Sequence, residues 1–302
     1  MNTLKETDHI KLLTIILSAA LLALHSYAFS ETTIRLISKD KLIHSDFARR
    51  VGIDQTTLLW PIQRCPKLFS KETQGILRSS IELVIICNAF RRAGFTGQIQ
   101  MIPSGNAQRQ KIELAKANAD LIAHSTFKQS LSHSIPPTAS RFLLTDPVIK
   151  QGQFLLGIFT SANQLAAVSK AFRENTYSTL IAATLTSWKI DIKTLQEMKL
   201  KSLHLLPRYN LIAPNIEHKR ANFTLAALDS NSPQKRRLKR VEGYKVALAD
   251  ERVFLVNKHQ PLLFKALQDY IAHLRTQDDA LTRAYRHANF ISDKYQNWTL
   301  IN

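Results

Sequence analysis

Residue types able to bind a polar solute follow most of the short apolar runs in this 302-residue chain. These runs are expected to be β-strands, with hydroxyl, amide, aromatic and basic side chains directly after them. In open α/β sheets, ligands bind outside the carboxyl ends of the strands, so these positions are candidates for a small-molecule cleft. The candidates at the strand ends are Asp40, Ser104, Asn106, Ser125, Thr126, Ser187, Trp188, Arg208 and Asp229, and Trp60 joins them from a long irregular loop.

Most of these candidates also have an ordinary structural explanation. Asn106 is suited to a turn, and Ser187 to the N-cap of the helix predicted after it. The free N–H groups of that same helix would favour an anionic ligand group. Both interpretations stay open for each residue, and together the strand ends indicate a cleft for a polar solute.

The motifs of common enzyme and metal sites are absent from the sequence. It has no G-x-S-x-G, H-E-x-x-H, P-loop or G-x-G-x-x-G motif, and only eight glycines. No Cys/His spacing is typical of a metal site. The two cysteines, Cys65 and Cys87, can form a disulfide in an oxidising compartment or stay free. We therefore expect a protein that is not an enzyme and holds no cofactor and no metal.

Residues 1–28 have the pattern of a secretory signal peptide. A Lys-containing polar start precedes the apolar run Leu12–Leu24, which is shorter than the roughly 20 residues needed to span a bilayer. Ser26 and Ala28 place small residues at the −3 and −1 positions of a cleavage site. The pattern predicts export to the periplasm, with an uncleaved membrane anchor as the alternative.

The chain is strongly basic, with a formal net charge of +18. Removal of residues 1–28 leaves this charge unchanged, because 39 Lys and Arg then face 21 Asp and Glu. Such a balance favours anionic partners. The basic residues are spread along the chain apart from the run Lys235–Arg240, which is typical of a solvated loop. Since the protein is expected to be exported, we predict no nucleic-acid partner and keep an acidic ligand as a candidate.

Two similar stretches indicate two similarly built lobes. Residues 101–125 and 205–229 align without a gap at an offset of 104 and share eight identities, including Asn106/Asn210. Each copy predicts a strand, a turn, a helix and a second strand, and chance similarity is the alternative explanation. Strand–helix alternation along the chain predicts mostly parallel sheets covered by helices.

Two β-like segments are expected to carry the chain between the lobes. They are Gly152–Thr160 and Arg252–Val256. The predicted organisation is therefore a signal peptide at 1–28, lobe 1 at 29–158 plus 252–302, and lobe 2 at 159–251.

Three stretches carry a resemblance to a known family. They are Ala117–Ala123 (ANADLIA), Leu144–Pro147 (LTDP) and the ending Leu263–Tyr285. In this order they resemble the type II, family-three-like, amino-acid-binding proteins of bacterial ABC transporters, over about residues 32–302. The resemblance implies an α/β fold of two Rossmann-like lobes joined by two hinge strands (periplasmic binding protein-like II). It also implies a monomer that closes over a small-molecule ligand and delivers it to an inner-membrane permease.

The family's ligand residues carry over only in part. The resemblance implies Arg141 for the ligand carboxylate. The acidic residue that would hold a ligand amine is replaced by Ala227, with Asp229 two residues later. A family turn in the second lobe is replaced by residues 186–188. These departures speak against a standard α-amino acid as the ligand.

Three functions are compatible with the sequence. The leading one is capture of a small polar solute, anionic or amino-acid-like, for transport. A dehydratase-like enzyme on the same scaffold would need a cleft carboxylate, for which Asp40, Asp146 and Asp229 are the candidates. A sensor or partner-binding module would use the basic run as a contact surface.

Overall fold

The computed structural model describes residues 33–38, 41–54, 56–131, 141–228 and 237–302. The predicted signal peptide, Asp40, Asp229 and the first two residues of the basic run, Lys235 and Arg236, lie outside these ranges. Within them, no helix is long and apolar enough to cross a membrane.

Lobe 1 is built on a mixed sheet, six-stranded in the described part of the chain, with the order β2-β3-β1-β4-β13-β6. Its three central strands are parallel, whereas β2, β13 and β6 are antiparallel to their neighbours. The expected mostly parallel sheet is therefore limited to the centre of this lobe. The strands are β1 (Thr33–Ser38), β2 (Leu59–Pro61), β3 (Gln98–Pro103), β4 (Leu121–Ile122), β6 (Phe142–Leu144) and β13 (Leu255–Asn257).

Helices cover both faces of this sheet, because its strands alternate apolar side chains between two cores. Leu36 of β1 packs with helices α2, α3, α9 and α10, while Ile37 packs on the opposite face with α4. Burial of apolar side chains on both faces is what stabilises such a layered lobe. The helices are α2 (Lys41–Val51), α3 (Arg78–Arg92), α4 (Ala107–Ala115), α9 (Pro261–Thr276) and α10 (Ala280–His287).

Lobe 2 contains a four-stranded sheet of order β10-β7-β11-β14 and the parallel pair β8–β9 in the part of the chain that the structure describes. A parallel bridge from Ala182 to Phe223 joins the pair to the start of β10. The strands are β7 (Leu155–Thr160), β8 (Ile181–Leu185), β9 (Ser202–Leu206), β10 (Thr224–Ala227), β11 (Lys239–Ala247) and β14 (Thr299–Leu300), and the helices are α5 (Leu165–Arg173), α6 (Lys189–Glu197) and α7 (Ile212–Glu217).

The two copies of the sequence repeat occupy equivalent places in the two lobes. The first copy forms β3, α4 and β4, and β1 lies between its strands in parallel. The second forms β9, α7 and β10, and β8 lies between its strands in the same way. The two-lobed α/β fold expected from the sequence is thus confirmed by the strand pairing itself.

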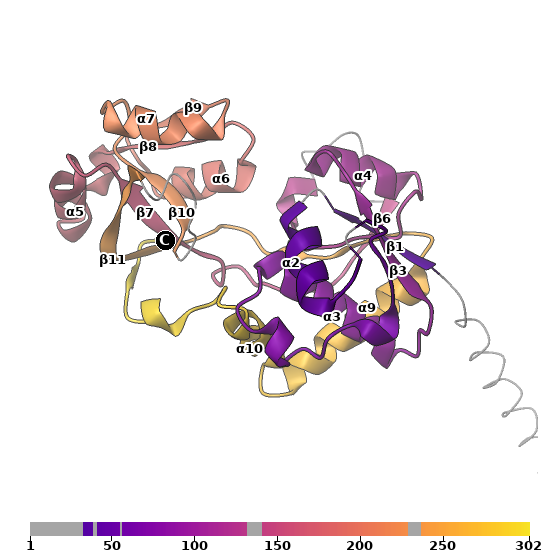
Figure 1. Cartoon of the computed structure of the whole chain (residues 1–302). Coiled ribbons are helices and arrows are strands. Elements are labelled where there is room, and N and C mark those ends of the chain that lie inside the picture. Colours follow the sequence, from indigo (N-terminus) through magenta and orange to yellow (C-terminus); the bar gives the residue numbers. More distant parts are fainter. Residues whose placement is uncertain (1–32, 39–40, 55, 132–140, 229–236) are drawn as a thin grey trace, which may run out of the picture.

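The chain passes between the lobes three times within the described ranges (Figure 1). The first two passages run side by side, since Ile149 bridges to Arg252 and the N–H of Leu248 donates to the carbonyl of Phe154. The third is the C-terminal tail, which leaves α10 in lobe 1 and ends as β14 in the sheet of lobe 2.

The lobe boundaries therefore differ from those expected from the sequence. All of β7 lies within the lobe 2 sheet, so the first passage ends before residue 155 rather than at 158. The tail expected in lobe 1 pairs with β11 of lobe 2. A two-residue strand has too little apolar pattern to be recognised in a sequence.

Cys65 and Cys87 form a disulfide with their Cα atoms 5.8 Å apart. It attaches the loop before α3 to the middle of that helix. The same loop is also held by Asn88, whose side-chain amide donates to the carbonyl of Pro66 at 2.8 Å.

Candidate ligand-binding cleft

A cleft of about 820 Å³ lies between the two lobes and is lined by both. Small-molecule sites commonly have volumes of roughly 300–1,000 Å³ and lie at domain interfaces. The two passages that run side by side, residues 149–154 and 248–252, lie beside the cleft, since Phe154, Leu248 and Arg252 belong to its lining. The cleft therefore has the size and position of a binding site that lobe movement could open or close.

The wall contributed by lobe 1 and the second passage is mainly polar and basic. It includes the guanidinium groups of Arg78 and Arg252, the ammonium group of Lys111 and the imidazole of His124. The hydroxyl and amide side chains on this wall are Ser79, Gln108, Gln110, Ser125, Thr126 and Ser130.

The wall contributed by lobe 2 is mainly apolar. Trp188 and Tyr209 form an aromatic pair there, with ring centroids 5.7 Å apart. Its polar exceptions include Ser187, Lys189 and Asp191. The other aliphatic and aromatic side chains of this wall include Phe159, Ile190, Ile212, Leu225 and Leu238.

Three helices of the described chain present their first turns to the cleft. The lining contains residues 78–79 of α3, residues 107–108 of α4 and residues 189–191 of α6. The N-terminal end of a helix carries a partial positive charge and unpaired N–H groups, which favour an anion. These helix ends add to the positive charge of the basic side chains.

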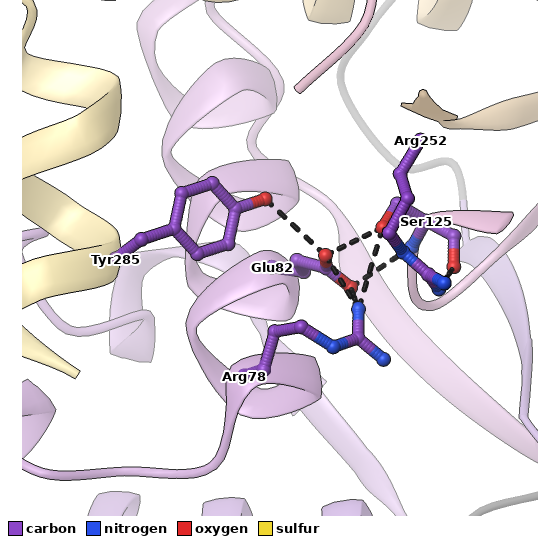
Figure 2. A network of polar contacts seen from close by, with 5 residues as sticks. All are labelled: Arg78, Glu82, Ser125, Arg252 and Tyr285. Carbon is purple, nitrogen blue, oxygen red and sulfur yellow. Dashed lines mark hydrogen bonds and ion pairs between the residues drawn. The ribbon is translucent and has the colours of Figure 1, made fainter. Parts of the chain in front are cut away.

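A buried carboxylate organises the basic side chains at the lobe 1 wall (Figure 2). Both carboxylate oxygens of Glu82 accept from Nη1 of Arg78 at 2.6 Å. Ser125 donates its N–H at 2.9 Å and its hydroxyl at 2.5 Å to the same carboxylate, and the hydroxyl of Tyr285 donates at 3.2 Å. Nε of Arg252 donates to Oγ of Ser125 at 2.9 Å.

This network stays charged although it is buried. Burial acts to raise the pKa of Glu82, but the two arginines and the Ser125 hydroxyl outweigh it, so this pKa lies below its usual value. Burial, together with the like charge of Arg78, lowers the pKa of Arg252 to about 9. At neutral pH two guanidinium cations therefore face one carboxylate, which leaves an excess positive charge at the cleft.

Arg78 is the group of this network best placed to bind a ligand. Its side chain is 22% exposed, and only its Nη1 atom contacts Glu82 and Ser125. Its Nε and Nη2 atoms donate to no residue that the structure describes. Guanidinium groups bind carboxylates with a pair of parallel hydrogen bonds, and these two nitrogens can supply such a pair.

Asp191 is the one carboxylate in the lining among the described residues. It lies in the first turn of α6, on the lobe 2 wall. Burial raises its pKa to about 7, and a hydrogen bond from its own backbone N–H acts in the opposite direction. Burial therefore favours the protonated, neutral form of the Asp191 side chain.

Four of the residues proposed from the sequence line the cleft, namely Ser125, Thr126, Ser187 and Trp188. They come from equivalent places in the two lobes, after β4 and after β8. The expected location at the carboxyl ends of central strands explains why they meet there.

The other described candidates lie elsewhere. Trp60 is buried in the lobe 1 core against Phe47, with ring centroids 5.5 Å apart. Ser104 follows β3, which is separated from the hinge side of the sheet by β1 and β4, and Asn106 caps α4 by accepting from the N–H of Arg109 at 2.8 Å.

The two predicted arginines are also outside the lining. Arg141 is exposed at the start of the edge strand β6, where its carbonyl accepts from the N–H of Lys258 at 3.3 Å. Arg208 is exposed before the short turn at residues 209–211. Asp40 and Asp229 cannot be placed, since they lie outside the described residues.

Sequence reasoning missed the basic groups of the cleft and Asp191. The spacing of Arg78 and Glu82, four residues apart at the start of a helix that is otherwise buried, is a signal of a buried ion pair. Arg252 directly precedes the apolar run Val253–Val256, where a charged residue needs a partner.

No family model and no curated protein sequence matches the chain. Among solved structures, an ancestral amino-acid-binding protein described as a precursor of cyclohexadienyl dehydratase is 10% identical with a TM-score of 0.46, covering 86% of this chain and 95% of that one. An amino acid ABC transporter substrate-binding protein from Streptococcus pneumoniae, bound to L-arginine, is 12% identical with a TM-score of 0.45, covering 88% and 98%. The GluR0 ligand-binding core with L-glutamate is 10% identical with a TM-score of 0.48, covering 70% and 89%. Of these three structures, the second is an ABC transporter substrate-binding protein, and none of the three specifies the ligand of this chain.

Proposed function

We propose that this protein is an exported solute-binding protein that captures a small anionic solute between its two lobes. The observation that carries the proposal is the cleft of about 820 Å³, to which each lobe contributes one wall. Basic side chains and helix N-termini give this cleft a positive charge that suits an anion.

Closure of the lobes about the passages supplies the capture mechanism. The two passages, residues 149–154 and 248–252, are short segments that pair with each other beside the cleft. Small backbone rotations in them therefore move whole lobes. A solute that contacts both walls stabilises the closed form, because only in that form are both sets of contacts made.

Delivery to an inner-membrane permease from the periplasm completes the proposed role. The leader pattern at residues 1–28 supports export, and release of the solute would follow when the permease favours the open form. We further propose that the protein acts as a monomer, since the cleft is formed by one chain.

The dehydratase-like alternative has less support in the cleft. Of its three candidate carboxylates, Asp146 is exposed and outside the lining, and Asp40 and Asp229 are outside the described residues. Asp191 is in the lining, and product formation from a carboxylic acid would shift the proposal toward this alternative.

A thermal-shift screen tests the proposal. The protein is expressed from all 302 residues, and the mass of the purified protein is measured by mass spectrometry. Amino acids, organic acids, polyamines and short peptides are then added. A solute that binds only the folded state raises the free energy of unfolding by about 2.7 kcal/mol when its concentration is a hundred times its Kd. A shift confined to anionic solutes is expected, and no shift across the screen would overturn the proposal.

A further inference from the structure

The two walls of the cleft differ in chemistry. On the lobe 1 side, the lining presents Arg78, Lys111 and Ser125, whose side chains donate hydrogen bonds or carry positive charge. On the lobe 2 side, it presents Trp188 and Tyr209 with aliphatic side chains around them. A solute that contacts both walls must therefore have a polar, negatively charged end and an apolar end.

The lining offers little to a ligand ammonium group. Glu82 is fully buried and already accepts hydrogen bonds from Arg78, Ser125 and Tyr285. Asp191 is the one carboxylate among the described lining residues, and burial raises its pKa to about 7. An ammonium group would thus meet one carboxylate whose charged form is disfavoured by burial, and several cations that repel it.

The apolar wall has room for a ring. Trp188 is partly buried and Tyr209 is 38% exposed, so both rings keep a surface that a solute can cover. Aromatic rings pair at centroid distances of about 4.5–7 Å, and a solute ring can join this pair in the same way. The cleft volume of about 820 Å³ exceeds what a solute of two or three carbon atoms would fill.

We propose that the ligand is an amine-free organic acid with an apolar, ring-sized body. Its carboxylate binds the Nε and Nη2 atoms of Arg78 and the ammonium group of Lys111, and its body packs on Trp188 and Tyr209. This inference rests on the proposed function and narrows it, because an acidic amino acid or a small acid without a ring would satisfy capture of an anionic solute and not this chemistry.

Calorimetric titration with a matched set of probes tests the inference. 3-Phenylpropionate has the carboxylate and the body, L-phenylalanine adds an ammonium group, phenethylamine lacks the carboxylate, and acetate lacks the body. We expect 3-phenylpropionate to bind with a Kd about tenfold or more below that of L-phenylalanine, because a buried unpaired charge costs more than that factor. We expect no binding of phenethylamine and at least about tenfold weaker binding of acetate, which buries far less apolar area.

Single variants assign the two ends of the probe. Arg78→Gln and Lys111→Gln should each raise the Kd of 3-phenylpropionate by about tenfold or more, because each variant loses a charge-assisted hydrogen bond to the carboxylate. Trp188→Ala should raise the Kd of 3-phenylpropionate by a similar factor and leave the Kd of acetate unchanged. Lys265→Gln is the matched control, since Lys265 is an exposed cation paired four residues away with Asp269 on the outer helix α9. It removes the same charge without touching the lining and should bind like the wild type.

The outcomes separate this inference from the proposed function. If L-phenylalanine or acetate binds more tightly than 3-phenylpropionate, or if only acidic amino acids bind, capture of a carboxylate-bearing solute stands and the amine-free, ring-sized acid is refuted. If only polyamines bind, capture of an anionic solute is refuted as well. If Trp188→Ala binds 3-phenylpropionate like the wild type, the assignment of the apolar wall is refuted. If no probe and no compound of the wider screen binds, the proposed function itself is refuted. Arg78→Gln also removes the ion pair with Glu82, so this variant can fail to fold. In that case Lys111→Gln alone tests the carboxylate site.

Discussion

Asp191→Asn should stabilise the protein at neutral and alkaline pH and leave its stability unchanged in acid. Asp191 lies in the cleft wall at the first turn of α6, where burial raises its pKa to about 7 from an ordinary 3.8. Between these two pH values the folded state keeps a proton that the unfolded state has lost. The stability of the wild type therefore falls as pH rises through this window, whereas asparagine does not titrate.

The size of the effect follows from the same two values. At about 1.4 kcal/mol per pH unit, a rise from 3.8 to about 7 corresponds to about 4 kcal/mol. Water still reaches part of the Asp191 side chain, so this figure is an upper limit. The advantage of the variant is absent below pH 3.8, grows through the window and is complete above pH 7.

Urea unfolding of both proteins at about pH 4, pH 6 and pH 8 measures this difference directly. Asp269→Asn is the control, because Asp269 is exposed on α9 and its substitution should change stability little at any of these values. Equal stability of wild type and Asp191→Asn at the highest pH would refute the claim that burial in the cleft wall disfavours the Asp191 carboxylate.

Three further substitutions test other parts of the structure by urea unfolding. Cys65→Ser removes the disulfide to Cys87, which has a sequence separation of 22. The chain-entropy model predicts a loss of about 3 kcal/mol in the free energy of unfolding. An unchanged urea midpoint would mean that the disulfide is absent in solution. Glu82→Gln leaves the buried Arg252 and the partly exposed Arg78 without their carboxylate, and it should lower the free energy of unfolding by about 3–5 kcal/mol. A loss below about 1 kcal/mol would show that the two arginines have another counter-ion. Gly157→Ala places a Cβ 2.9 Å from two side chains and should lower the free energy of unfolding by about 1–3 kcal/mol. Gly105→Ala is its control, because a Cβ there meets nothing within 4 Å. Equal losses in the two variants would contradict the packing at Gly157.

The long helices were predictable because their apolar spacing reflects burial on one face. The apolar spacing of Phe264, Leu267, Ile271 and Leu274 predicts a helix over Pro261–Arg275, and the structure has a helix at Pro261–Thr276. The apolar spacing of Leu77, Ile81, Val84 and Ile85 predicts a helix over residues 74–93. The helix starts later, at Arg78, because Gly75 adopts a φ of +64° and its N–H donates to the carbonyl of His287. That contact joins residues far apart in the sequence and leaves no local signal.

The candidate site was only partly predictable for a related reason. Ser125 and Ser187 were found because they follow central strands, and the carboxyl ends of such strands meet at the cleft. Ser104 also follows a strand, but the order of the sheet places that strand away from the hinge, and strand order is not encoded locally. Arg78 was missed because it starts a helix, and which helix ends face the cleft depends on the packing of the lobes.

The measurement that tests the central claim most directly is small-angle X-ray scattering during titration with solute. Every compound that raises the melting temperature in the screen is added to saturation, and the radius of gyration is compared with that of the free protein. We predict a smaller radius with an anionic solute, because contacts to both walls draw the lobes together around the cleft. Binding with an unchanged radius, or no binding by any anionic compound, would contradict capture by closure of the lobes.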